Sequence, residues 1–254
     1  MGALLQVRDL SVRFGGVVAL DKVSFDVNAG EVVALIGPNG AGKTTLFNVI
    51  TRVYRPSAGG VSIDGKPVSS IRAHYIVRHG LARTFQNVAL FRSMTVLENV
   101  LVGDHIQTKS GWLDASLPLP RSLANESASR NRALDMIDFV GLAQHADRPV
   151  AALPFGVQKR VELARALVSK PRLLLLDEPA GGISHEEVDA TARLLRKVHT
   201  ELGVTMLLVE HHMAFVMGIS DRVVVLDFGK KIAEGTPSEV QQNRAVIEAY
   251  LGAA

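Results

Sequence analysis

The fold of this chain is decided by the stretch Gly37-Pro38-Asn39-Gly40-Ala41-Gly42-Lys43-Thr44-Thr45, which matches the phosphate-binding P-loop pattern G-x-x-x-x-G-K-[ST]. Its glycines let the backbone turn tightly and present N–H groups to phosphate oxygens. Lys43 supplies a cation for the β- and γ-phosphates, and the Thr44 hydroxyl can ligate Mg²⁺. Residues 31–36 predict a buried strand before the loop, and residues 44–50 predict a helix after it.

Length and composition are those of an ordinary globular protein. The chain has 254 residues, 47% of them hydrophobic and 21% charged, enough for one or two domains with a sizeable core. It contains no cysteine, which excludes disulfides and thiolate metal sites. A net charge of +3 without blocks of like charge predicts no nucleic-acid binding.

Neither a signal peptide nor a membrane span is expected. Arg8 and Asp9 lie where a signal peptide needs an apolar core. The apolar runs at residues 173–176, 205–209 and 223–226 are far shorter than the roughly 18 residues of a spanning helix. We therefore expect a protein that is soluble by itself.

Two strand patterns surround the P-loop. Residues 4–12, 23–27 and 61–63 predict an antiparallel sheet, with Asp64-Gly65 as a hairpin turn. The last third alternates strands with helices, which predicts a mostly parallel sheet carrying the phosphates at its carboxyl edge. Its expected strands cover residues 172–176, 204–209 and 222–226, and its expected helices cover residues 186–202, 212–217 and a last one opened by the capping box Thr236-Pro237-Ser238-Glu239.

Residues 70–165 are expected to be mostly helical and irregular. A helix over residues 71–79 precedes a short strand over residues 81–86. Residues 104–130, polar and with two prolines, predict a loop-rich insertion. Further helices are expected over residues 96–102, 129–140 and 157–168.

Several side chains outside the P-loop are suited to nucleotide chemistry. Asp177 and Glu178 end an apolar strand and point to opposite faces, so Asp177 suits Mg²⁺ and Glu178 suits polarising an attacking water. His211 follows the strand over residues 204–209, at the same sheet edge. Solvated acids and a structural histidine are the plainer alternatives. The amide of Gln86 can reach Mg²⁺ or its water, and Phe14 is either a core aromatic, which the residue alone favours, or a ring that stacks on a base.

Taken in order, these motifs resemble those of ATP-binding-cassette (ABC) ATPase subunits over nearly the whole chain. The matching motifs are the A-loop aromatic Phe14, Walker A at residues 37–45, the Q-loop Gln86, the signature at residues 153–158, Walker B at residues 173–178 with Glu178, and the switch His211. Phe14-Gly15-Gly16, the 104–130 insertion, Glu210-His211-His212-Met213 and residues 246–252 resemble the ATPase subunits of branched-chain amino acid importers.

Two segments depart from the family pattern. The signature is Leu153-Pro154-Phe155-Gly156-Val157-Gln158 instead of L-S-G-G-Q, so Pro154 replaces a serine that would contact the γ-phosphate held by the partner subunit. Gly156 and the following helix N-terminus can still donate to phosphate. Residues 180–184 lack the usual D-loop aspartate, which puts communication across a dimer in question.

The resemblance implies an α/β fold, the P-loop NTPase fold of ABC ATPases, with a mostly parallel core sheet, an antiparallel β subdomain and a helical subdomain. Residues 1–254 would form one ABC ATPase domain, with residues 1–86 and 166–254 as the nucleotide-binding core and residues 87–165 as the helical signature subdomain. ATP and Mg²⁺ are the implied cofactors. The implied catalytic residues are Glu178 and His211, the Mg²⁺ ligands are Thr44, Gln86 and Asp177, and the ATP-binding residues are Phe14, Gly37, Pro38, Asn39, Gly40, Ala41, Gly42, Lys43, Thr44, Thr45 and Gln86, with Gly156 reaching the partner's ATP.

The resemblance also implies partners. Two cassettes, identical or paralogous, would bind ATP between them and drive separate membrane permease subunits served by an external solute-binding protein. The chain would then lie at the cytoplasmic face of the plasma membrane as a peripheral subunit. A urea or amide importer, a lipid or lipopolysaccharide exporter, and a weakly hydrolysing ATP switch are the alternatives. The transported solute is not encoded in this chain.

Overall fold

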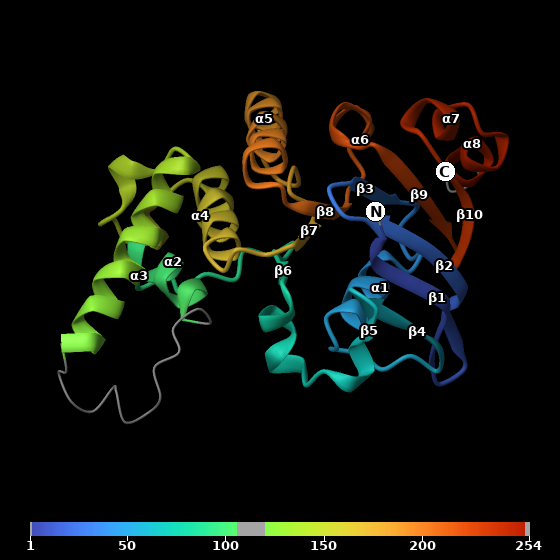
Figure 1. The fold of residues 1–254 in the computed structure, drawn as a ribbon. Helices are drawn as coiled ribbons and strands as arrows, with labels where there is room; N and C mark the ends of the chain where they lie inside the picture. Colours follow the sequence, from blue (N-terminus) through green and yellow to red (C-terminus); the bar gives the residue numbers. More distant parts are fainter. Residues whose placement is uncertain (1, 106–119, 252–254) are drawn as a thin grey trace. The chain divides into compact units, whose positions relative to one another are not determined.

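The strand that leads into the P-loop lies inside a parallel sheet in the computed structural model, which describes residues 2–105 and 120–251. β3 (Val32–Ile36) pairs in parallel with β8 (Thr205–Val209) and β9 (Arg222–Asp227), and β8 pairs in parallel with β7 (Leu173–Asp177). Every residue of β3, β7 and β8 is buried, as expected of strands covered on both faces. The full order is β10-β9-β3-β8-β7-β6, with β10 (Lys230–Gly235) antiparallel to β9 and β6 (Leu81–Arg83) at the other edge (Figure 1).

A second sheet is antiparallel and follows the order β2-β1-β4-β5. Its strands are β1 (Ala3–Phe14), β2 (Val17–Asn28), β4 (Ala58–Ile63) and β5 (Lys66–Pro67). One hydrophobic core joins this sheet, the parallel sheet and α1 (Lys43–Ile50). Phe47 of α1 is fully buried there, so the helix that follows the P-loop is anchored by both sheets.

The chain divides into two compact units. The first, Met1–Leu81 with Arg172–Ala254, holds the antiparallel sheet and the four parallel strands; the second is Ala82–Pro171. The other helical segments of the first unit are α5 (His185–Leu202), α6 (Met213–Ile219), α7 (Pro237–Gln241), α8 (Arg244–Leu251) and the 3₁₀ segments Val68–Ser70 and Ala73–His79.

The second unit is helical and is built on α2 (Val96–Asp104), α3 (Pro120–Phe139) and α4 (Phe155–Leu167), with 3₁₀ segments at Ala143–His145 and Val150–Ala152. Asp104, fully buried at the end of α2, accepts hydrogen bonds from Ser129 and from the Arg132 guanidinium of α3, the latter at 2.6 Å. The ion pair fixes α3 against α2, because a buried carboxylate without a partner would be costly.

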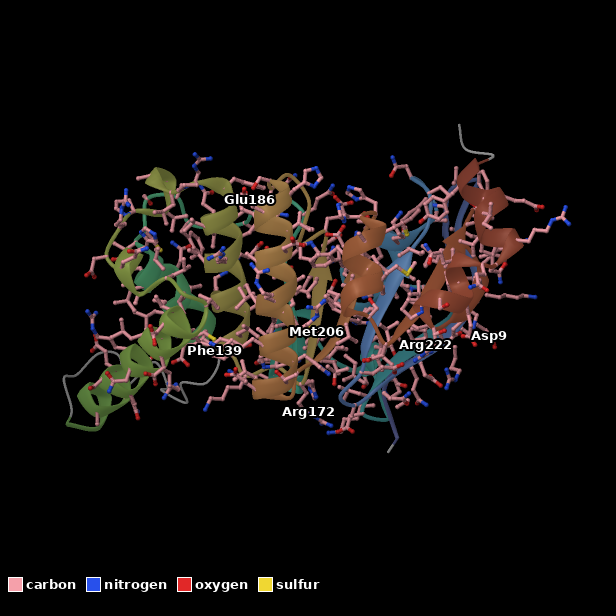
Figure 2. The ribbon with its side chains drawn as sticks, turned by 90° about the horizontal axis from the view of Figure 1, so that it is seen from above. Asp9, Phe139, Arg172, Glu186, Met206 and Arg222 are labelled. Carbon is pink, nitrogen blue, oxygen red and sulfur yellow. The ribbon has the colours of Figure 1, made fainter. Side chains whose placement is uncertain are left out.

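Arg222 ties the other end of the parallel sheet together, at the start of β9 (Figure 2). Its guanidinium donates to Glu31 at 2.7 Å and to the Asp26 carbonyl at 2.7 Å, and it also pairs with Glu234. These residues lie at the amino ends of the parallel strands, away from the edge that carries the P-loop.

Most of the expected elements are confirmed, including the strand and helix around the P-loop, the Asp64-Gly65 turn and the capping box of α7, in which Thr236 accepts from the Glu239 amide. None of the described helices is long and apolar enough to cross a membrane.

Five expectations about elements were wrong. Residues 73–79 form a 3₁₀ helix, and β6 ends at Arg83. Residues 120–128, expected to be part of a loop, belong to α3, and residues 106–119 lie outside the described residues. β10 was missed because its polar residues form an exposed edge strand. The last expected helix is two helices, α7 and α8.

Candidate functional site

The P-loop (residues 37–45) fits closely between strands of the first unit. Gly37 has φ 150°, and a Cβ there would lie 2.0 Å from the Leu226 carbonyl oxygen at the end of β9. Gly42 has φ 100°, and its Cβ would lie 2.6 Å from the Ala19 oxygen of β2. A side chain at either position would clash with backbone, so glycine is required by space as well as by conformation.

The side chain of Lys43 folds back over the P-loop. Its Nζ donates to the carbonyl oxygens of Gly37 at 2.6 Å and Pro38 at 2.9 Å. Burial lowers the pKa of Lys43, while the nearby carboxylates of Glu178 and Asp177 raise it in part. The ammonium is thus held at the P-loop, close to both acids, where it can face an anion.

The backbone amides at the N-terminus of α1 contribute hydrogen-bond donors to the same site as the Lys43 ammonium. The helix begins at Lys43 after Gly42, which provides no side-chain cap. The first-turn amides of a helix have no intrahelical acceptor, and the helix dipole favours negative charge there. Pro38, Asn39, Gly40, Ala41, Thr44 and Thr45 complete the loop, with Asn39, Gly40 and Thr44 exposed. Together these groups form a site suited to phosphate.

The two acids at the end of β7 differ in environment. Asp177 is the last residue of the strand and is 5% exposed. Glu178 leaves the strand in a left-handed conformation, φ 50°, with its amide donating to the Val209 carbonyl at 2.9 Å. A non-glycine residue with positive φ is uncommon. The backbone therefore leaves the strand conformation at Glu178.

The side chain of His211, which follows β8, lies near the side chain of Glu178, which follows the neighbouring strand β7. β7 and β8 are paired with Asp177 opposite Val209, so the residues that follow each strand come out side by side. Nδ1 of His211 lies 3.9 Å from Oε1 of Glu178, and the His211 side chain is 63% exposed. Lys43, Asp177, Glu178 and His211 are therefore brought together at one edge of the sheet.

A fully buried carboxylate that the sequence reasoning passed over holds these loops. Glu210 follows β8 and accepts hydrogen bonds from the amides of Ala180, His211 and His212. The signal in the sequence was a charged residue directly after four apolar residues, Met206 to Val209. His212, given no role from the sequence, accepts from the Phe215 amide at the start of α6.

Phe14 is not a core aromatic. It is the last residue of β1 and is 46% exposed, and its ring makes a T-shaped contact with the Tyr54 ring at a centroid separation of 5.1 Å. β1 pairs with β2, whose Ala19 and Leu20 border Gly42 of the P-loop. An exposed ring on this hairpin is available to stack on a base.

Gln86 belongs to the second unit and lies in an exposed segment after β6. The segment is held by α4. Glu162 accepts from the amides of Phe85 and Ala89, and Arg165 donates to the Ala89 carbonyl at 2.6 Å. Burial raises the pKa of Glu162, and these amides and Arg165 lower it in part.

The residues of the expected signature segment open α4 in the same unit. Pro154 is the N-cap, and the helix begins at Phe155, two residues earlier than expected. Gly156 therefore lies in the first turn, where backbone amides lack helical acceptors. Gln158 donates from its side chain to the Leu153 carbonyl at 2.8 Å, which ties the helix start to the residue before the proline.

Comparison with known families gives two matches. The model of the ABC transporter family matches residues 20–181, and the model described as branched-chain amino acid ATP-binding cassette transporter matches residues 230–254.

Individual proteins match over nearly the full chain. The branched-chain amino acid transport ATP-binding protein LivG of Salmonella typhimurium is 43% identical over 251 residues, 99% of this chain and 98% of LivG. BraF of Pseudomonas aeruginosa, with the same description, is 42% identical over the same shares. A crystal structure of an ATP-binding cassette of an ABC transporter in its ADP conformation is similar with a TM-score of 0.85 and 31% identity, over 99% of this chain and all of that one.

Proposed function

This chain belongs to the ATP-binding subunits of ABC transporters, and from that membership we propose that it hydrolyses ATP to drive the import of branched-chain or related amino acids. The observation that carries the proposal is the match to LivG and BraF, which extends over 99% of this chain and 98% of LivG. The family model of the branched-chain amino acid cassettes supports it independently at residues 230–254.

We assign ATP binding to the P-loop and to Phe14. Lys43 and the amides of the loop and of α1 would hold the phosphates, and Phe14 would stack on the adenine. This assignment is supported by the close packing of Gly37 and Gly42 against the backbone of β9 and β2, which fixes the shape of the loop that presents these donors. The role of Gln86 stays a prediction of the sequence.

We assign the chemistry to the loops after β7 and β8. Glu178 would take a proton from the attacking water as the water oxygen bonds to the γ-phosphorus and the bond to the β-γ bridging oxygen breaks, leaving ADP and phosphate. His211, 3.9 Å from Glu178, would orient that carboxylate and the γ-phosphate. We expect this contact to shorten when the substrate binds, as catalytic hydrogen bonds often do.

The oxygen donors of the site fit Mg²⁺. The first unit offers the Thr44 hydroxyl at the exposed start of α1 and the Asp177 carboxylate, and no described group of three or more acids, histidines or cysteines could enclose a metal. Mg²⁺ is held in this way when phosphates and water supply most of its ligands. When bound, it neutralises charge on the β- and γ-phosphates.

We propose three kinds of partner. A second cassette, a copy or a paralogue, would receive the start of α4 with Gly156 at its ATP, and membrane permease subunits would take up the resulting motion. A solute-binding protein would deliver the amino acid from outside. The chain would lie at the cytoplasmic face of the membrane through its permeases.

The test is to purify the chain with the membrane proteins that accompany it from its own cells and to reconstitute them in liposomes. We expect ATP-dependent uptake of labelled leucine, isoleucine or valine in the presence of the co-purifying binding protein, lost in Lys43→Ala. Uptake of a different solute would replace the substrate assignment, and export would overturn the direction.

A further inference from the structure

We infer that Glu210 is a positioning residue of the ATPase site, whose buried carboxylate sets the separation of Glu178 and His211 by binding the backbone of both loops. This inference rests on the assignment of the chemistry to these two side chains. Because Glu210 is fully buried, it would act through its neighbours and not by direct contact with ATP.

The geometry of Glu210 is that of a bridge. Its side chain is fully buried at the end of β8. Oε1 accepts from the Ala180 amide at 2.6 Å, two residues beyond Glu178 in the β7 loop (residues 178–184). Oε2 accepts from the amides of His211 at 3.0 Å and His212 at 3.3 Å. Each carboxylate oxygen therefore serves a different loop.

Two other contacts lie close to this bridge, and the 3.9 Å approach of His211 to Glu178 joins the same two loops through their side chains. The Glu178 amide bonds to the Val209 carbonyl at 2.9 Å, which extends the β7–β8 ladder by one step. The next backbone turn, closed by the Gly181 amide on the Glu178 carbonyl at 3.0 Å, is local to the β7 loop. The Ala180–Glu210 bond ties that turn to the residue that follows β8.

A carboxylate is the chemistry this bridge requires. Three amide donors point at its two oxygens, and an ionised carboxylate accepts on both sides. Glutamine has the same shape but presents an NH₂ group to at least one of these N–H donors, which leaves the buried amide unsatisfied and pushes one loop away. A displacement of about 1 Å at a catalytic group can lower a rate about 100-fold.

The first experiment compares Glu210→Gln with a matched control, Glu31→Gln. Glu31 is also a largely buried glutamate of the same unit that accepts from a backbone amide, but it lies at the amino end of β3 with Arg222. We expect Glu210→Gln to lower the kcat of ATP hydrolysis about 10- to 100-fold, with ADP affinity and KM close to the parent. Glu31→Gln should lower the melting temperature and leave kcat within about twofold.

A double-mutant cycle with His211→Ala separates positioning from general destabilisation. If Glu210 acts through Glu178 and His211, Glu210→Gln should lower kcat much less in the His211→Ala background than in the parent. If Glu210→Gln has no cooperative thermal transition, Glu210→Asp replaces it, because the shorter carboxylate keeps the charge and cannot reach both loops.

The outcomes are distinct. Parental kcat in a folded Glu210 variant, an equal loss of kcat and ADP affinity, or full additivity with His211→Ala would each overturn the inference while leaving the ATPase assignment intact. A parent protein without ATPase activity, alone and with its membrane partners, would instead overturn the proposed function.

Discussion

The P-loop and the β7 loop are built at the same edge of one sheet by opposite means. The P-loop is shaped by glycines that have no room for a Cβ, and its donors are backbone amides and a lysine folded onto its own carbonyls. The β7 loop is shaped by a buried glutamate and a left-handed Glu178, and it presents side chains. A backbone site suits the binding of phosphate, which every turnover requires, whereas a side-chain site suits proton transfer. We therefore expect binding and turnover to be separable by substitution.

Glu178→Gln should produce the largest change. The amide keeps the shape of the side chain but cannot accept the proton, so kcat should fall about 10²- to 10⁴-fold while nucleotide binding stays. Steady-state phosphate release measures this, and size-exclusion chromatography with ATP should show a trapped dimer. Turnover near the parental rate would remove Glu178 from the role of base.

Lys43→Ala should have the opposite effect and weaken nucleotide binding by the P-loop. It removes the cation from the P-loop, and a hydrogen bond to a charged group is worth about 1.5–3 kcal/mol, so nucleotide affinity should fall about 10- to 150-fold. Titration calorimetry with ADP on a variant of unchanged melting behaviour measures the loss. Unchanged affinity would contradict the assignment of the phosphates to this loop.

Phe14→Ala tests whether the Phe14 ring contributes to nucleotide binding by stacking on the base. Base stacking would make the loss equal for ATP and ADP, about 1–3 kcal/mol if it resembles stacking in single-strand nucleic-acid binders. Because the ring is 46% exposed, folding stability should change little. A lower melting temperature with unchanged affinity would point to a packing role instead.

Pro154→Ser should have the smallest effect. Gly156 already lies in the first turn of α4, where its amide is available to the partner's nucleotide, so we expect the ATPase rate to change less than about tenfold. The serine also relaxes the unfolded chain, which costs about 0.4–1 kcal/mol. An inactive parent that is rescued by serine would support the ATP-switch alternative.

The parts that sequence reasoning predicted well are those where local chemistry decides the structure. The P-loop with its strand and helix, and the α7 capping box at Thr236 and Glu239, follow from residue types at fixed spacings. The parallel pairing of β3, β8 and β9 follows from apolar runs that alternate with helices.

The parts that it missed depend on tertiary surroundings. A charged residue after an apolar run is the local signal at Glu210, but it does not predict full burial, because glutamate is usually exposed and the Ala180 amide that it binds comes from another loop. The exposure of Phe14 depends on how the β1–β2 hairpin ends, and the residue type favoured a core position. β10 carries a polar sequence that reads as loop and pairs only because β9 offers an edge.

The separation of binding from turnover is tested most directly by measuring two quantities, the affinity for ADP and the steady-state kcat of ATP hydrolysis. Both are measured on Lys43→Ala and on Glu178→Gln, purified in parallel with the parent protein. We predict that Lys43→Ala loses affinity and that Glu178→Gln keeps parental affinity and loses kcat. Parallel losses of both quantities in Glu178→Gln, or full affinity in Lys43→Ala, would contradict the account.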